Sequence, residues 1–310
     1  MGYIETSRVR LTEHGAQANL RALLLQLCVA GRVRCGAKTL RPSAATTAQV
    51  ATVLDGGDFY PDEPIAAFAW PLLLQAGSLA QLAAGKLALT TRGQQALTQP
   101  PHQVLASLWQ RWLSSTILDE FSRDIEAIKG QRAANVLSAR PEPRRAHVGA
   151  ALAVLPDDEW TTVDQLFTSM RKAGHNPAIA RSDRALWKLY LEDPEYGSLG
   201  YDGHHAWELL QGRYTLAVLF EYAAPLGLID VDYVDAPGLP AQLGRRRAGA
   251  AQPLRRATRD PADRARRLRH RPIPCLPAGH CPRTGCCRGR RGAEGPGQPR
   301  LGRPRRPASC

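Results

Sequence analysis

The sequence predicts a mainly α-helical chain with short β-hairpins, an α+β fold that ends in a disordered tail rich in Arg, Pro and Gly. Apolar side chains recur at helical spacing along most of residues 1–240, and short apolar runs around a glycine interrupt them. Residues 241–310 differ in composition: they hold 19 Arg, no Lys, three acidic side chains and no Phe, Trp or Tyr. This tail carries a charge of +16 and residues 1–240 carry −3, which together give the formal net charge of +13.

Helices are expected to dominate the beginning of the chain. Leucines at helical spacing predict a helix over residues 17–30. Ser43 is a suitable N-cap for a second helix that runs to about residue 54, because its hydroxyl can accept a hydrogen bond from a backbone N–H of the first turn. Pro64 favours the start of a third helix, and Gly77 ends it.

The spacing of apolar residues then becomes that of short strands. Residues 79–82 and 86–90 predict the two strands of a hairpin around Gly85, and Thr90 or Thr91 can cap a last helix that runs through residue 97. Three helices, a hairpin and a closing helix are the element order of a winged-helix domain, which we assign to residues 1–98 as a first module.

The expected partner of such a module is double-stranded DNA. Its third helix would enter the major groove and its hairpin would follow the backbone. The alternative is a small α+β domain that binds a protein or acts as a spacer. The candidate DNA contacts are cations for phosphates, Lys38, Arg41, Lys86 and Arg92, and polar side chains for bases, Thr46, Gln49 and Gln75.

Residues 99–145 predict a helical connector that ends in a linker. The helix is expected from residue 102 to residue 128, and its acidic cluster at 119–126 contains no His, which favours a solvated helix face over a metal site. Lys129 and Arg132 follow the helix and are further candidates for phosphate contact. Two prolines and three arginines at 140–145 predict a domain linker.

Residues 146–235 predict an incomplete second winged-helix module. Thr161 or Thr162 can cap one helix, residues 207–224 form a long apolar helix, and residues 226–233 form a strand. The order helix, glycine, strand is the same as in residues 74–79, which indicates a duplicated unit. The second copy lacks a second strand that would complete its hairpin, because the residues after 235 have no apolar run of that kind.

Residues 236–310 predict a disordered basic tail that is read out of frame. GC-rich DNA that is read in a wrong frame encodes this composition, which consists of Arg, Pro, Gly, Ala and Cys without Lys or aromatic residues. A shift of one base permits the string IRLTALG after Ala251, a counterpart of residues 87–93, so that the missing strand and helix reappear. The alternative is a disordered basic arm, whose 19 Arg would bind nucleic acid without sequence preference. The tail cysteines lack the paired spacing of a zinc site: Cys275, Cys281, Cys286 and Cys287.

Five short motifs carry a resemblance to a known group of proteins. They are FAWPLL at 68–73, DEF at 119–121, IKGQ at 128–131, GSLGY at 197–201 and GRY at 212–214. With them, the chain resembles actinobacterial winged-helix proteins described as helicase-associated, which are similar to the DNA-binding region that accompanies XPB-type helicases. The resemblance implies tandem winged-helix modules, DNA binding, and a helicase or another protein as partner.

The sequence predicts a protein that is not an enzyme. Lys86 follows a glycine, but Leu87 stands where a phosphate-binding loop has Ser or Thr. Asp202, His204 and His205 are the candidates that an enzyme would offer, and an ordered loop explains them better. We therefore expect a cytoplasmic DNA-binding protein without metal, cofactor or membrane association. The alternatives are a protein-interaction scaffold, because the Trp-rich body carries −3, and a nonfunctional truncated gene product.

Overall fold

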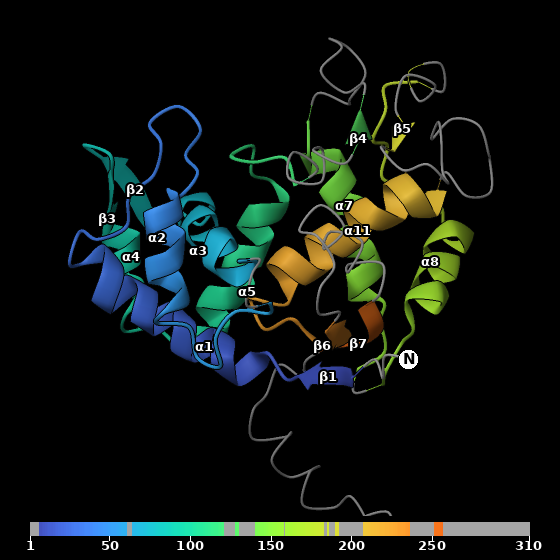
Figure 1. Cartoon of the computed structure of the whole chain (residues 1–310), viewed down its shortest axis with the longest axis horizontal. Coiled ribbons are helices and arrows are strands. Elements are labelled where there is room, and N and C mark those ends of the chain that lie inside the picture. Colours follow the sequence, from blue (N-terminus) through green and yellow to red (C-terminus); the bar gives the residue numbers. More distant parts are fainter. Residues whose placement is uncertain are drawn as a thin grey trace, which may run out of the picture. The chain divides into compact units, whose positions relative to one another are not determined.

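The computed structural model describes residues 6–60, 64–120, 128–129, 140–157, 159–182, 185, 190–191, 207–235 and 251–256, which all belong to the unit Met1–Ala265. Helices are the main elements, and the sheets are short and antiparallel (Figure 1). The predicted class, helical with short hairpins, is confirmed at this level.

The first predicted helix is present, and it starts four residues earlier than expected. α1 (Glu13–Ala22) continues into the π-helical stretch η1 (Leu23–Cys28). Thr12 fixes the start of α1 through distant partners. Its N–H donates to the carboxylate of Asp230 at 2.9 Å, and its hydroxyl donates to the carbonyl of Ile229 at 2.5 Å. Because these partners lie more than 200 residues away in the sequence, no local pattern could have located this helix start.

The other elements of the first module follow in the predicted order. The Ser43 hydroxyl accepts from the N–H of Thr46 at 3.2 Å, and the Thr90 hydroxyl accepts from the N–H of Gly93 at 3.0 Å, so both predicted caps are confirmed. The elements are α2 (Ala44–Ala51), α3 (Ala66–Ala76), β2 (Ala80–Ala83), β3 (Lys86–Leu89) and α4 (Thr91–Ala96). β2 and β3 pair antiparallel, as the hairpin prediction requires.

The position of α3 differs from that of a helix that enters a DNA groove. Eight of its eleven residues are buried. It packs against α2, α5 (Pro101–Leu113) and η3 (Leu219–Ala223). Its sequence, AAFAWPLLLQA, is apolar on all sides, which is typical of a core helix. Its first turn is capped by Asp58, whose carboxylate accepts from three backbone N–H groups between residues 65 and 67.

The connector contains a buried charge network where solvated charges and a linker were expected. α7 (Glu142–Ala153) begins inside the predicted linker, and α5 ends well before residue 128. Arg145 and Glu120 are 0% and 1% exposed, and the guanidinium Nε donates to the Glu120 carboxylate at 2.5 Å. Arg144 is also buried and pairs with Asp119. Three of these four side chains are therefore interior, and Asp119 is partly exposed; charges can be buried where each finds an opposite charge.

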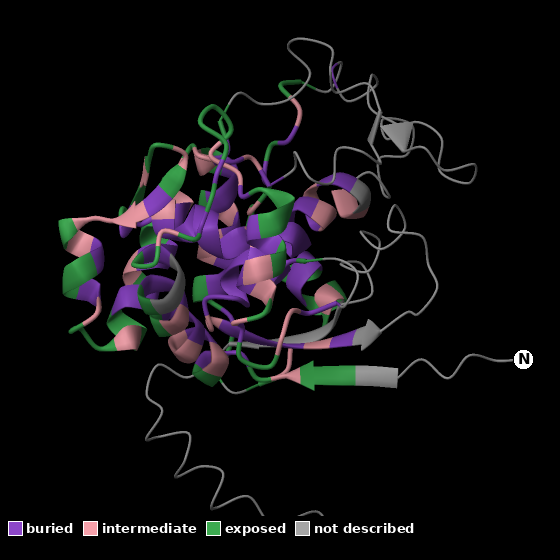
Figure 2. Ribbon diagram, turned by 60° about the vertical axis from the view of Figure 1, so that its left-hand side comes forward, coloured by how far each residue is buried: buried purple, intermediate pink, exposed green. Residues whose placement is uncertain are grey.

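A long helix crosses the second half of the described chain, as predicted for residues 207–224. It consists of η2 (Glu208–Gly212), α11 (Arg213–Val218) and η3. α8 (Val163–Lys172) carries a complete capping box formed by Thr162 and Gln165. Buried side chains from both predicted modules form one cluster, which extends from Ala16 to Tyr233 (Figure 2). The two modules thus share a core.

The longest sheet joins three distant parts of the chain. Its strands are β1 (Thr6–Arg10), β6 (Ile229–Asp235) and β7 (Ala251–Arg256), in the order β1-β6-β7, with both pairs antiparallel. β6 is the predicted strand, whereas β1 was not expected. β7 pairs antiparallel with β6 and lies inside the tail that was predicted to be disordered, so that prediction is wrong for residues 251–256. A further short pair consists of β4 (Ile128–Lys129) and β5 (Tyr190–Leu191).

Candidate nucleic-acid interface

Residues 33–35 form a third, strand-like segment beside the hairpin. Arg34 is bridged to Lys86 of β3, and Cys35 is bridged to Pro42. Two backbone hydrogen bonds hold the segment to the hairpin: the Leu87 N–H donates to the Val33 carbonyl at 2.8 Å, and the Cys35 N–H donates to the Gly85 carbonyl at 3.2 Å. The hairpin turn at 84–85 and the loop at 36–41 therefore flank the same segment.

Five cationic residues lie on or directly before this segment, on β3 or in the adjoining loop, and we call them the hairpin cluster: Arg32, Arg34, Lys38, Arg41 and Lys86. All are exposed except Arg41, which is half-buried. Residues that face each other across an antiparallel pair place their side chains on the same face of the sheet, so Arg34 and Lys86 are side by side. The stem of Lys86 also passes over residue 31, because its Cδ lies 3.9 Å from where a Cβ on Gly31 would be.

The stretches of sequence that carry the hairpin cluster contain no carboxylate. Residues 14–54 and 64–118 contain eight Lys and Arg and no Asp or Glu. Of the acidic residues between these stretches, Asp58 caps α3, and Asp55 lies 3.9 Å from the His14 ring. His14 stands at the opposite end of α1–η1 from the hairpin, roughly 20 Å away at 1.5 Å per residue. This separation exceeds the Debye length of about 8 Å at physiological ionic strength, so Asp55 has little effect on the potential at the hairpin cluster.

Two predicted base-reading residues have structural roles instead. Thr46 is 3% exposed, and its hydroxyl both accepts from the Arg34 N–H and donates to the Arg34 carbonyl, each at 2.9 Å. The Gln75 amide donates to the carbonyls of Leu40 and Pro71 at 2.9 and 3.0 Å. Thr46 thus fixes the backbone beneath Arg34, and Gln75 fixes the end of the loop that carries Lys38 and Arg41. Gln49 is half-buried on α2.

The remaining predicted contacts lie elsewhere. Arg92 turns toward α5, where its guanidinium donates to the Ser107 hydroxyl at 2.7 Å. The side chain of Lys129 and the whole of Arg132 lie outside the described residues, as do Asp202, His204, His205 and the tail cysteines. The structure therefore brings together Lys38, Arg41 and Lys86 of the predicted set.

Sequence reasoning missed Arg32 and Arg34, which belong to the same cluster. The signal that could have found them is the alternation of residues 32–35, where the exposed arginines alternate with the buried Val33 and Cys35. This is the period of a strand with one buried face, and it places both arginines on the outer face. Burial raises the pKa of the Cys35 thiol to about 11, which marks the inner face as apolar.

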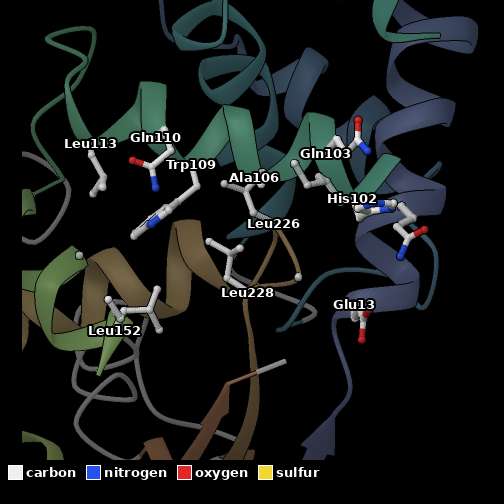
Figure 3. A pocket seen from close by; sticks show the side chains of 15 residues that line it. Glu13, His102, Gln103, Ala106, Trp109, Gln110, Leu113, Leu152, Leu226 and Leu228 are labelled. Carbon is white, nitrogen blue, oxygen red and sulfur yellow. The ribbon is translucent and has the colours of Figure 1, made fainter. Parts of the chain in front are cut away.

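A separate feature is an apolar cleft of about 280 Å³ between α1, α5, α7 and the turn that precedes β6 (Figure 3). Trp109 and Leu152 lie on one side, and Glu13 and His102 lie on the other, on separate helices (Figure 3). Glu13 and His102 are the titratable side chains of its lining. A cleft of this kind accommodates an apolar ligand group or an apolar side chain of a partner.

No family model, curated protein or solved structure matches this chain. Within the described ranges, no helix is long and apolar enough to span a bilayer. The same residues include no group of three or more His, Cys, Asp and Glu side chains that could hold a metal ion.

Proposed function

We propose that this chain is a non-enzymatic protein that binds duplex DNA through the phosphate backbone, with the hairpin cluster as its contact surface, in association with a helicase or as a regulator. The observation that carries the proposal is the juxtaposition of Arg34 and Lys86. Like charges that face each other across a strand pair repel, which costs stability in the free protein. A polyanion removes this repulsion, because phosphates bind between the two cations.

The mode of binding follows from the burial of α3. Its apolar side chains are packed against α2, α5 and η3. The proposed contact therefore consists of cations from a hairpin and two loops that meet phosphates. Contacts of this kind position a protein on DNA and carry little sequence information. We expect binding that depends strongly on salt and weakly on DNA sequence.

Fluorescence anisotropy of a labelled duplex tests this proposal with the full chain. The salt slope of log K is expected to decrease by about 0.9 for each phosphate contact that is lost. Lys86→Gln and Arg34→Gln together should therefore reduce the slope by about 2. The arginine-rich tail is present in every variant, so the difference between variants isolates the hairpin cluster.

The matched control is Arg21→Gln with Arg111→Gln, which removes two exposed arginines outside the cluster. These control changes should leave the salt slope close to that of the parent chain. The proposal is wrong if both double variants lower the slope equally, because binding would then follow net charge and the tail. It is also wrong if neither variant changes the slope.

The apolar cleft favours a second candidate, a protein-interaction scaffold. Its lining includes Trp109 of α5, and Leu226 and Leu228 of the turn that precedes β6. A scaffold that uses the cleft would bind its partner equally well after Lys86→Gln and less well after Leu228→Asp. Comparing these two variants for DNA affinity and for partner capture distinguishes the candidates.

A further inference from the structure

A polar cavity of about 200 Å³ lies between α4 and α5, apart from the hairpin cluster. Arg92 and Gln95 of α4, Gln99 beyond its end and Ser107 of α5 supply its polar lining, and Val104 and Leu108 form part of the apolar lining. All of these residues belong to the described chain, and none is acidic. The cavity therefore offers hydrogen-bond donors around a single cation.

Arg92 is the dominant charge of this cavity. Its side chain is half-buried, and the one hydrogen bond that the described residues give it is to the Ser107 hydroxyl. A guanidinium has five N–H donors in a planar fork, so most of its donor capacity remains for a ligand. Among the described residues, no carboxylate forms an ion pair with Arg92, and residues 64–118 contain no acidic side chain at all.

The Ser107 contact also holds the guanidinium in place. Because Arg92 and Ser107 belong to different helices, their hydrogen bond fixes the fork at the junction of α4 and α5. A fixed fork loses less side-chain entropy when it binds an oxyanion than a mobile one does. The amides of Gln95 and Gln99 line the same space and can donate to further oxygens.

We propose that this cavity binds a phosphate group, with Arg92 as the charged ligand and Ser107 as the residue that positions it. The chemistry favours a tetrahedral oxyanion, because several donors surround one cation and no acidic side chain lines the space. The volume is also suitable: a water molecule occupies about 30 Å³ in the liquid, so the cavity has room for a phosphate with some of its hydration. The phosphate can come from a free phosphorylated metabolite or from the end of a DNA strand.

The first test is a titration of the full chain with inorganic phosphate at constant ionic strength, with chloride as the reference anion. The readout is the Nε–Hε signal of Arg92 in an NMR spectrum of nitrogen-labelled protein, assigned by its loss in Arg92→Lys. This signal reports on Arg92 alone, so the arginines of the tail do not obscure it. We expect a saturable shift with phosphate and none with chloride. A signal that responds identically to both anions would overturn the proposal.

Variants test the assigned roles. Ser107→Ala keeps the charge of Arg92 and removes its anchor, so the phosphate dissociation constant read from the same signal should rise about tenfold, as expected for loss of about 1.4 kcal/mol. Arg111→Gln, on the same helix and exposed, is the matched control and should leave the constant unchanged. An unchanged constant in Ser107→Ala would refute the positioning role of Ser107.

A DNA arm distinguishes the two sources of phosphate. If the ligand is a strand end, a duplex with a 5′-phosphate should shift the Arg92 signal at a lower concentration than the same duplex with a 5′-hydroxyl. If the ligand is a free metabolite, the two duplexes should behave alike and inorganic phosphate should still titrate the signal. The hairpin variant Lys86→Gln with Arg34→Gln separates this site from the proposed DNA surface, because it should not alter the phosphate titration.

Discussion

Replacing Arg145 with Met should destabilise the chain strongly, because the side chain is fully buried and holds several groups at once. Its Nε donates to the Glu120 carboxylate at 2.5 Å. Its Nη1 donates to the carbonyls of Trp112 and Ser115 at 2.7 and 2.5 Å, and its Nη2 donates to that of Leu118 at 2.5 Å. Burial by itself lowers the pKa of Arg145, but the charge and hydrogen bond of Glu120 outweigh it and raise the pKa overall.

The expected loss can be worked out from these contacts. Breaking a buried ion pair by removing one partner costs about 3–5 kcal/mol, because the other charge stays buried without compensation. The Tyr214 hydroxyl still donates to Glu120 at 3.1 Å, which lowers that cost in part. Three backbone carbonyls also lose their donor, at about 1–3 kcal/mol for each one that stays dry. We expect Arg145→Met to reduce the free energy of unfolding by at least about 4 kcal/mol, with the larger losses reached where the carbonyls stay dry.

Urea unfolding followed by tryptophan fluorescence measures this effect. The Arg145 guanidinium lies over the Trp112 ring, with its Cζ 4.2 Å from the ring centroid. The matched control is Arg140→Met, which changes an exposed arginine just before the same helix and should cost less than about 0.5 kcal/mol. The double variant Arg145→Met with Glu120→Leu should recover the part of the loss that comes from the unpaired charge, because it removes both charges, while the three carbonyls still lack their donor. A loss below about 1 kcal/mol for Arg145→Met would refute the reasoning.

Three further predictions follow from close packing and from pKa shifts. A Cβ on Gly93 would lie 2.0 Å from the Leu79 carbonyl oxygen, so Gly93→Ala should lower the free energy of unfolding by about 1–3 kcal/mol in urea unfolding. Burial raises the pKa of the Cys28 thiol to about 12, so peptide mapping after N-ethylmaleimide treatment at pH 8 should find it unlabelled in the folded chain and labelled in urea. Burial, and then the nearby His175, lower the pKa of His147 below its ordinary value. Its neutral form is therefore favoured in the folded chain, and its contribution to stability should be present above about pH 6.5 and be lost as the pH falls through the lowered pKa. Melting temperatures between pH 5 and 8 should fall less steeply on the acid side in His147→Gln, and identical profiles for parent and variant would contradict this assignment.

The structure moves the candidate DNA contact from the third helix to the hairpin. A winged-helix module is expected to read DNA with its third helix, yet α3 is buried beneath α5 and η3. The proposed surface is instead the edge of the hairpin and the loops beside it. This is also why Arg32 and Arg34 matter more here than Thr46, whose hydroxyl is used within the fold.

The sequence by itself determined the local elements. Ser43 and Thr90 could be assigned as caps because each bonds a backbone N–H three residues away, within one helical turn. The hairpin at 80–89 and the long helix after Trp207 followed from apolar periodicity in the same way. For the candidate interface, the residue types of Lys38, Arg41 and Lys86 indicated phosphate contact, but their position around one segment could not be read from their spacing.

The tertiary structure alone decided which charges are buried and which helix faces solvent. The charged runs 119–120 and 144–145 have the composition of exposed segments, and pairing between residues 25 apart allows Glu120, Arg144 and Arg145 to be buried. β1 likewise depends on β6, more than 200 residues later in the sequence. The physical reason is common to both cases: the free energy of burying a charge or of pairing a strand depends on a partner that is distant in sequence, whereas caps and periodicity depend on neighbours.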